Sequence, residues 1–251
     1  MTKSVGAEAV TPPLAASAGS RPETRAGLPG WEDRTTAAEV RFLGRSAAGS
    51  SAEAGVRAWI GESRHVARMH QVHGATVLDA RPGDCDEADA LMTDQPELAL
   101  TVVTADCVPI LLASASRIAA VHAGWRGFVG GVVAAALDRF TDRSEVVAWI
   151  GPAIGPCCYE VGEDVALPVV ARSSPAVRSI GERGRPHLDL GLAAEIELLR
   201  AGVSEVRRLT ICTACHPQLL ESYRRGKREG RPAGRNLSFI WRRAQPAIQD
   251  V

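Results

Sequence analysis

The clearest pattern of apolar positions lies between residues 97 and 140. Three short apolar runs, at 98–103, 108–113 and 118–122, have the length and β-branched content typical of strands. From Val129 to Phe140 the apolar residues instead recur at spacings of three and one, which predicts one face of a helix. This block therefore predicts three strands followed by a helix.

Further along the chain, apolar runs predict strands at 146–150, 206–212 and 237–241. Residues 190–201 predict a helix, with Asp189 as its N-cap and Gly202 as its end. Strands outnumber helices and do not alternate regularly with them. This favours an α+β fold, a single domain with a mixed β-sheet core flanked by helices.

The N-terminal region lacks such periodicity. Residues 1–28 are rich in Ala, Ser, Thr, Pro and Gly, which predicts a flexible tail, and a second loose stretch is expected at 46–55. Well-formed order is expected from about Val56 to Arg243, within a single catalytic domain spanning 29–251. A chain of 251 residues can bury a sizeable core.

Composition excludes several classes of protein. The formal net charge is zero, which argues against nucleic acid or an anionic membrane as a partner. We find no apolar run long enough to span a bilayer and no signal peptide. The six cysteines do not resemble a small disulfide scaffold, so we expect a cytoplasmic protein with free or metal-bound thiols.

Three side chains stand in segments suited to chemistry: His73 in HQVHG, Cys107 in TADCVP and His122 in VHAGWRG. Two imidazoles and a thiolate can bind a borderline-soft metal and leave one coordination position open. A buried cysteine and a core histidine are the alternatives, and the spacing matches no short metal motif. Asp106, however, is costly to bury unpaired, and a site would explain its presence beside Cys107.

Other candidate groups are weaker. Cys212–His216 matches C-x-x-C-H, but haem attachment requires export, so incidental thiols or a secondary metal or redox pair remain. Cys157 and Cys158 are adjacent and therefore difficult to bridge to each other. Arg126 precedes the predicted helix, where it would serve either as an anion site or as a surface residue.

Taken together, these segments resemble a known family, labelled laccase-domain or polyphenol-oxidase-like proteins, purine nucleoside phosphorylase/adenosine deaminase proteins, or peptidoglycan editing factors. The resemblance runs in order from about residue 66 to 242. Its motifs are HQVHG (70–74), ADA (88–90), TADC (104–107), HAGWRG (122–127), IGPAIGP (150–156), YEVG (159–162), LDL (188–190), SYRR (222–225) and GR (234–235). The family's usual N-terminal Asn-Leu-Gly and Gly-Asp-Asp pattern is not recognisable in residues 25–60.

The resemblance implies a zinc site formed by His73, Cys107 and His122 in a cytoplasmic, mostly monomeric α+β domain related to cysteine hydrolases. It also implies phosphorolysis of adenosine, inosine or methylthioadenosine, and deamination of adenosine. In this interpretation the partners are a purine nucleoside and phosphate.

The roles of the surrounding residues follow from this interpretation. Arg126, and Arg224 or Arg225, would bind phosphate. Glu160 or Asp106 would move a proton or orient a ligand. Two rival hypotheses use the same residues: a cysteine hydrolase acting on peptidoglycan precursors, with Cys107 as nucleophile, and a copper-dependent polyphenol oxidase.

Overall fold

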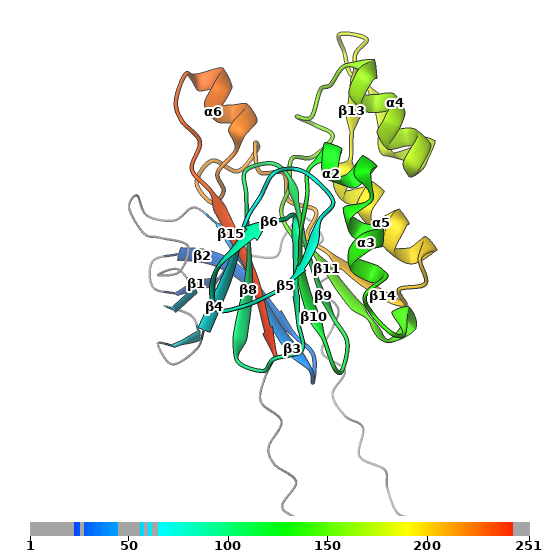
Figure 1. Ribbon diagram of the computed structural model, residues 1–251. Coiled ribbons are helices and arrows are strands. Elements are labelled where there is room, and N and C mark those ends of the chain that lie inside the picture. Colours follow the sequence, from blue (N-terminus) through cyan, green and yellow to red (C-terminus); the bar gives the residue numbers. More distant parts are fainter. Residues whose placement is uncertain (1–22, 26–27, 45–55, 58–59, 62–64, 243–251) are drawn as a thin grey trace, which may run out of the picture.

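The computed structural model describes residues 23–25, 28–44, 56–57, 60–61 and 65–242. Most strands belong to two large mixed sheets, which lie side by side in Figure 1. The seven-stranded sheet has the order β1 (Glu23–Arg25), β2 (Leu28–Arg34), β3 (Ala38–Leu43), β15 (Asn236–Arg242), β8 (Leu98–Thr104), β4 (His65–His70) and β6 (Gly83–Glu87).

The six-stranded sheet carries the predicted central strands. Its order is β14 (Glu205–Arg208), β11 (Val147–Ile150), β9 (Val108–Ala113), β10 (Ile118–Ala123), β7 (Ala90–Thr93) and β5 (Val77–Asp79). A separate hairpin pairs β12 (Arg178–Ile180) with β13 (Pro186–Leu188). Each large sheet contains both parallel and antiparallel pairs, which confirms the predicted α+β fold with mixed sheets.

Between residues 65 and 242 the helices are few and short. They are α2 (Trp125–Gly130), α3 (Val132–Leu137), α4 (Glu163–Arg172), α5 (Leu190–Arg200) and α6 (Tyr223–Glu229), with 3-10 turns at Arg143–Glu145 and Pro175–Val177. In Figure 1, α2 to α5 lie on the side of the six-stranded sheet away from its partner, whereas α6 stands beside the end of β15. None of the helices in the described ranges is long and apolar enough to cross a membrane.

The two largest apolar clusters, one on each face of the six-stranded sheet, explain the continuous apolar runs. Leu111 of β9 packs toward the other sheet with Leu100 and Trp149, whereas Ile110 and Leu112 pack toward the helices. Because β9 and β10 are covered on both faces, every residue in them is buried.

The predicted helix over 129–140 is in fact two helices. Gly131 lies between α2 and α3 with a φ of 91°, the left-handed region that ends a helix. A Cβ at Gly131 would also lie 3.3 Å from the Arg172 guanidinium, so the position has both a conformational and a steric reason to be glycine. Helix α5, in contrast, begins as predicted, with the Asp189 carboxylate accepting the Leu192 N–H at 2.7 Å.

Two predicted boundaries were wrong. Order begins before Val56, because β1 to β3 pair antiparallel from Glu23 onward, in part of the segment expected to be a tail. The rest of that tail, and the loose stretch at 46–55, lie outside the described residues. The strand predicted at 206–212 ends at Arg208, and the chain then follows an irregular path to Cys212.

Candidate active site

Three segments that cross from one large sheet to the other meet at one end of the molecule. The connection from β4 to β5 carries His73, that from β6 to β7 carries Asp89, and that from β8 to β9 carries Cys107. His122 lies in β10 opposite Pro109, beside the start of β9. Residues distant in the sequence therefore meet because the chain changes sheets repeatedly at this end.

His73, Cys107 and His122 form a compact group of potential metal ligands. Their ligand atoms all lie within 4.8 Å of one another, and the Cys107 Sγ is 3.9 Å from His73 Nε2. Gly124 leaves room for this group, because a Cβ there would lie 2.9 Å from His73 Cδ2 and 3.2 Å from Cys107 Sγ. The donor set and the space fit a metal with one open position.

Asp89 is hydrogen-bonded to two of these three residues, His73 and His122, and positions them. Its carboxylate is fully buried, accepts backbone N–H groups of His73 at 2.9 Å and Gly74 at 2.6 Å, and lies 2.7 Å from His122 Nδ1. These contacts hold His73 at its unusual φ of 61° and leave His122 Nε2 free to face the site. Burial alone would raise the pKa of Asp89, but the hydrogen bond to His122 and the backbone hydrogen bonds keep that pKa below its usual value.

The Cys107 thiol and the His122 imidazole shift each other's pKa. Burial raises the pKa of Cys107, but hydrogen bonds to His122 and His73 outweigh it and lower the pKa to about 7. Burial lowers the pKa of His122, but hydrogen bonds to Asp89 and Cys107 outweigh it and raise the pKa to about 9. Without metal, His122 is therefore protonated near neutral pH, whereas the Cys107 thiol is close to the midpoint of its ionisation.

Asp106 lies at the turn before Cys107, and its carboxylate is bound by two other loops. It adopts a φ of 91°, and its carboxylate accepts the Thr213 hydroxyl at 2.6 Å and the Arg224 backbone N–H at 2.7 Å. These bonds occupy both carboxylate oxygens and tie three loops together. The carboxylate of the half-buried Asp106 thus has hydrogen-bond partners, as its place beside Cys107 requires.

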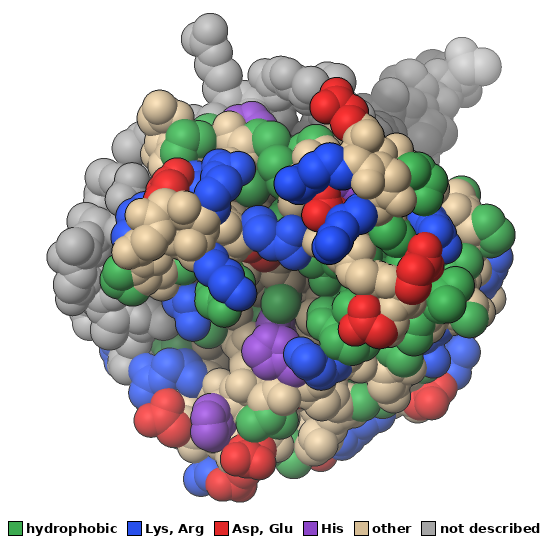
Figure 2. Space-filling view, turned by 90° about the horizontal axis from the view of Figure 1, so that it is seen from above, with side chains coloured by type: hydrophobic (Ala, Val, Ile, Leu, Met, Phe, Trp, Pro, Cys, Tyr) green, Lys and Arg blue, Asp and Glu red, His purple; other side chains and the backbone are tan. Residues whose placement is uncertain are grey.

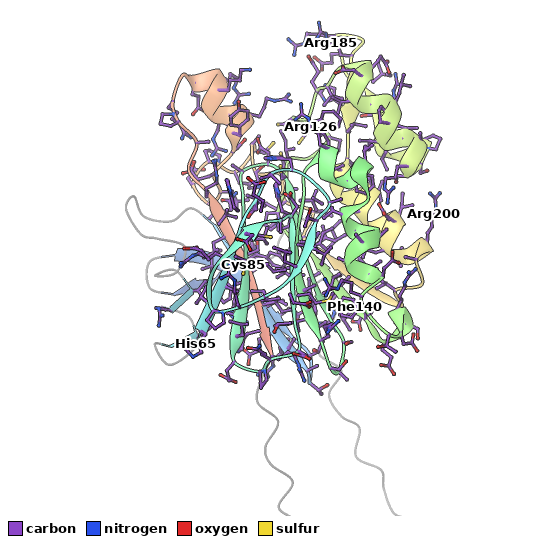
Figure 3. All side chains as sticks on the ribbon, in the orientation of Figure 1. His65, Cys85, Arg126, Phe140, Arg185 and Arg200 are labelled. Carbon is purple, nitrogen blue, oxygen red and sulfur yellow. The ribbon has the colours of Figure 1, made fainter. Side chains whose placement is uncertain are left out.

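A cavity of about 770 Å³ opens over the ligand group. Its wall includes His73, Cys107, His122, Tyr159 and, around the mouth, the cationic side chains of Arg126, Arg224, Lys227 and Arg235. Figure 2 looks onto this end of the molecule and shows a hollow with Lys and Arg side chains gathered around it and a His side chain beside it. Figure 3 places Arg126 between α6 and the region of α4 and β13.

Two of the predicted functional residues lie outside the cavity wall. The Arg225 guanidinium is buried and donates to the backbone carbonyls of Thr213, Ala214 and Leu220, so its charge supports a loop. The Glu160 carboxylate pairs with Arg183 at 2.6 Å. Neither side chain lines the cavity, so their positions do not support proton transfer by Glu160 or phosphate binding by Arg225.

The sequence-based interpretation missed Asp89 and Tyr159 as residues of the site. An acidic residue between two alanines was the available signal for Asp89, because a buried carboxylate requires partners. Tyr159 carries no comparable signal. Burial and the nearby charge of Cys107 raise its pKa to about 12, so its phenol stays neutral and can donate a hydrogen bond into the cavity.

His70 and His73 should differ sharply when substituted. His73 belongs to the ligand group, whereas the His70 imidazole is mostly exposed and lies 3.7 Å from the Glu87 carboxylate. We expect His73→Ala to lose most of any metal bound at this group, and His70→Ala to keep it. Elemental analysis of both purified variants tests this, and equal losses would contradict the assignment of His73.

Comparisons with known proteins agree with this architecture. The family model described as multi-copper polyphenol oxidoreductase laccase matches residues 48–243. A purine nucleoside phosphorylase of Pseudomonas aeruginosa is 39% identical over 179 residues, covering 69% of this chain and 72% of that protein. A purine nucleoside phosphorylase of Streptomyces coelicolor is 40% identical over 183 residues, covering 69% and 73%.

Solved structures have the same fold. A protein of Neisseria meningitidis matches with a TM-score of 0.74 at 29% identity, covering 86% of this chain and 99% of that one. YlmD from Geobacillus stearothermophilus matches with a TM-score of 0.75 at 27% identity, covering 93% and 100%. The chain therefore belongs to the family described as multi-copper polyphenol oxidoreductase laccase.

Proposed function

We propose that this chain is a zinc-dependent purine nucleoside phosphorylase acting on adenosine, inosine or methylthioadenosine, and that it also deaminates adenosine. The observation that carries the proposal is the group of His73, Cys107 and His122 in the wall of a cavity with a cationic mouth. The names of the relatives from Pseudomonas aeruginosa and Streptomyces coelicolor support the substrate class. Zinc accepts imidazole and thiolate ligands together.

The cationic mouth suits phosphate. Arg126 stacks over the Trp125 ring at 4.6 Å, and neither Arg126 nor Lys227 pairs with a carboxylate within the described part of the chain. The Arg224 guanidinium donates to the Glu160 carbonyl at 2.8 Å, which positions it over the Tyr159 ring. An oxyanion entering the mouth would thus meet fixed, uncompensated positive charge.

The cavity is also large enough for a nucleoside, since ligand pockets commonly measure about 300–1,000 Å³. In phosphorolysis the bond between C1′ of the ribose and the purine breaks, a phosphate oxygen bonds to C1′, and the departing base takes a proton. The neutral Tyr159 phenol lines this cavity and can donate a hydrogen bond to the base or the sugar. When bound, zinc supplies Lewis-acid activation of water near neutral pH, which is the chemistry that deamination requires.

The experiment that tests this function is release of hypoxanthine from inosine with and without phosphate. We expect release to require phosphate, and Arg126→Ala to raise the KM for phosphate by about 10- to 100-fold, because a charge-assisted hydrogen bond contributes roughly 1.5–3 kcal/mol. Arg143→Ala is the matched control, because Arg143 pairs with Asp138 outside the cavity wall. Equal release without phosphate would rule out phosphorolysis.

One observation favours a second candidate, a cysteine hydrolase. Cys107, His122 and Asp89 supply a thiol, an imidazole that can take its proton and an orienting carboxylate, which is the arrangement of a nucleophilic cysteine. In this candidate the orienting carboxylate is Asp89, which lies 2.7 Å from His122 Nδ1. The two candidates differ in whether the thiolate binds metal or attacks the substrate.

A further inference from the structure

A second group of thiols lies where two neighbouring strands end. Strands β11 and β14 pair in parallel, so the loops that follow them leave the same edge of the sheet. Cys157 and Cys158 lie in the first loop, and Cys212 and Cys215 in the second. An isolated parallel bridge between Ala153 and Cys212, with the Thr213 N–H donating to the Ala153 carbonyl at 3.0 Å, holds the two loops together.

The four sulfur atoms lie at spacings suited to one ion. All lie within 4.8 Å of one another, and Cys215 Sγ is 3.5 Å from Cys157 Sγ and 3.4 Å from Cys158 Sγ. A zinc ion with Zn–S bonds of about 2.3 Å in a tetrahedron separates its sulfurs by about 3.8 Å. A disulfide would need a separation of about 2.05 Å, and all four cysteines are free.

The backbone on both sides of Cys212 brings the thiols together. The Cys215 N–H donates to the Cys212 carbonyl at 3.2 Å and closes a tight turn between these two cysteines. Gly155 also leaves the space clear, because a Cβ there would lie 3.2 Å from Cys212 Cβ and 3.4 Å from Cys157 Sγ.

We propose that Cys157, Cys158, Cys212 and Cys215 bind a structural zinc ion, separate from the site formed by His73, Cys107 and His122. Four thiolates fill a tetrahedral coordination shell and leave no open position, so this ion has a structural role. His216 is not one of the four clustered ligands, and its Nδ1 lies 2.9 Å from the Cys212 carbonyl.

The proposed ion would stiffen one wall of the cavity. Tyr159 directly follows Cys158, and the Arg224 guanidinium reaches the Cys158 and Glu160 carbonyls. On the other loop, Thr213 directly follows Cys212 and donates its hydroxyl to Asp106, the residue before Cys107. A single ion would thus join the loop that carries Tyr159 to the loop that holds Asp106.

The test is metal content of the full chain grown with zinc and purified without chelator. We expect about two zinc equivalents in the wild type, and about one in Cys107→Ala and one in Cys157→Ser/Cys215→Ser, because each set of changes removes one site. Cys85→Ser is the matched control, because Cys85 is a buried cysteine of β6 outside both ligand groups, and it should keep both equivalents.

Cobalt gives a second readout that does not depend on catalysis or on the folding of the double variant. Cys107→Ala loaded with Co²⁺ alone should show the intense charge-transfer and d–d absorption of a tetrahedral tetrathiolate site. A metal-free Cys107→Ala with four free thiols would overturn the proposal, as would a mass lower by two hydrogens that reports a disulfide among these cysteines. Either result would leave the zinc site of the proposed phosphorylase intact if the wild type still held one equivalent.

Discussion

Chelation of purified protein should abolish inosine phosphorolysis, and added zinc should restore it. In the zinc mechanism Cys107, His73 and His122 are the three zinc ligands. Removal of the ion, or of one of these ligands, therefore removes the catalytic metal. Cys107→Ala should likewise lose most of the metal and reduce kcat/KM by at least about 1,000-fold, the scale of removing a principal catalytic group. Turnover assays on the chelated, the reconstituted and the variant protein measure this.

Alkylation of Cys107 separates the zinc enzyme from the cysteine hydrolase. Bound zinc should shield the thiolate, so labelling should be slow in the loaded protein and fast after chelation. In the metal-free protein the labelling rate should rise with pH with a midpoint near 7, the pKa that the two imidazoles impose on Cys107. Activity that survives complete removal of metal would refute the zinc mechanism and favour Cys107 as a nucleophile.

Asp89→Ala should be among the most destabilising single substitutions in the chain. The change leaves the His122 imidazole and the backbone N–H groups of His73 and Gly74 buried without their acceptor. Loss of one partner from a buried charged network costs about 3–5 kcal/mol. Metal affinity should also fall by at least about 10- to 100-fold, the effect of removing a group that orients a ligand. Denaturant unfolding and metal titration measure the two effects.

Asp84→Ala is the control for this substitution. Asp84 lies on β6, five residues before Asp89, but its side chain is 80% exposed and pairs with Arg68 at the surface. Exposed pairs of this kind contribute little to stability, so this variant should unfold at nearly the same denaturant concentration as the wild type. Similar losses in the two variants would show that Asp89 does not organise the site.

The positions of Cys107 and His122 relative to the strands were predictable from short polar motifs at the ends of apolar runs. Cys107 between two strands and His122 at the end of another were both placed correctly, because continuous apolar runs mark strands buried on both faces. What the pattern could not show is which loops meet. That depends on repeated crossings between two sheets, and no short motif records which loops these crossings bring together.

Elements with polar sequences were missed for a related reason. Helix α6, Tyr223–Glu229, is mostly charged and shows no apolar stripe. It is held instead by its Ser222 N-cap and by Arg225, whose guanidinium is buried among carbonyls. Tertiary hydrogen bonds replace apolar periodicity here. The antiparallel strands β2 and β3 were missed because charged residues interrupt their apolar positions.

The crossings between the sheets also have a thermodynamic consequence. Because His73, Cys107 and His122 come together only when both sheets are docked, an ion bound by all three recognises the native state and not the unfolded chain. Its binding free energy then adds to the free energy of unfolding, by about 1.4 kcal/mol for each tenfold rise in free metal above the dissociation constant. The melting temperature of this protein should therefore rise with the free concentration of any metal ion that these three residues bind.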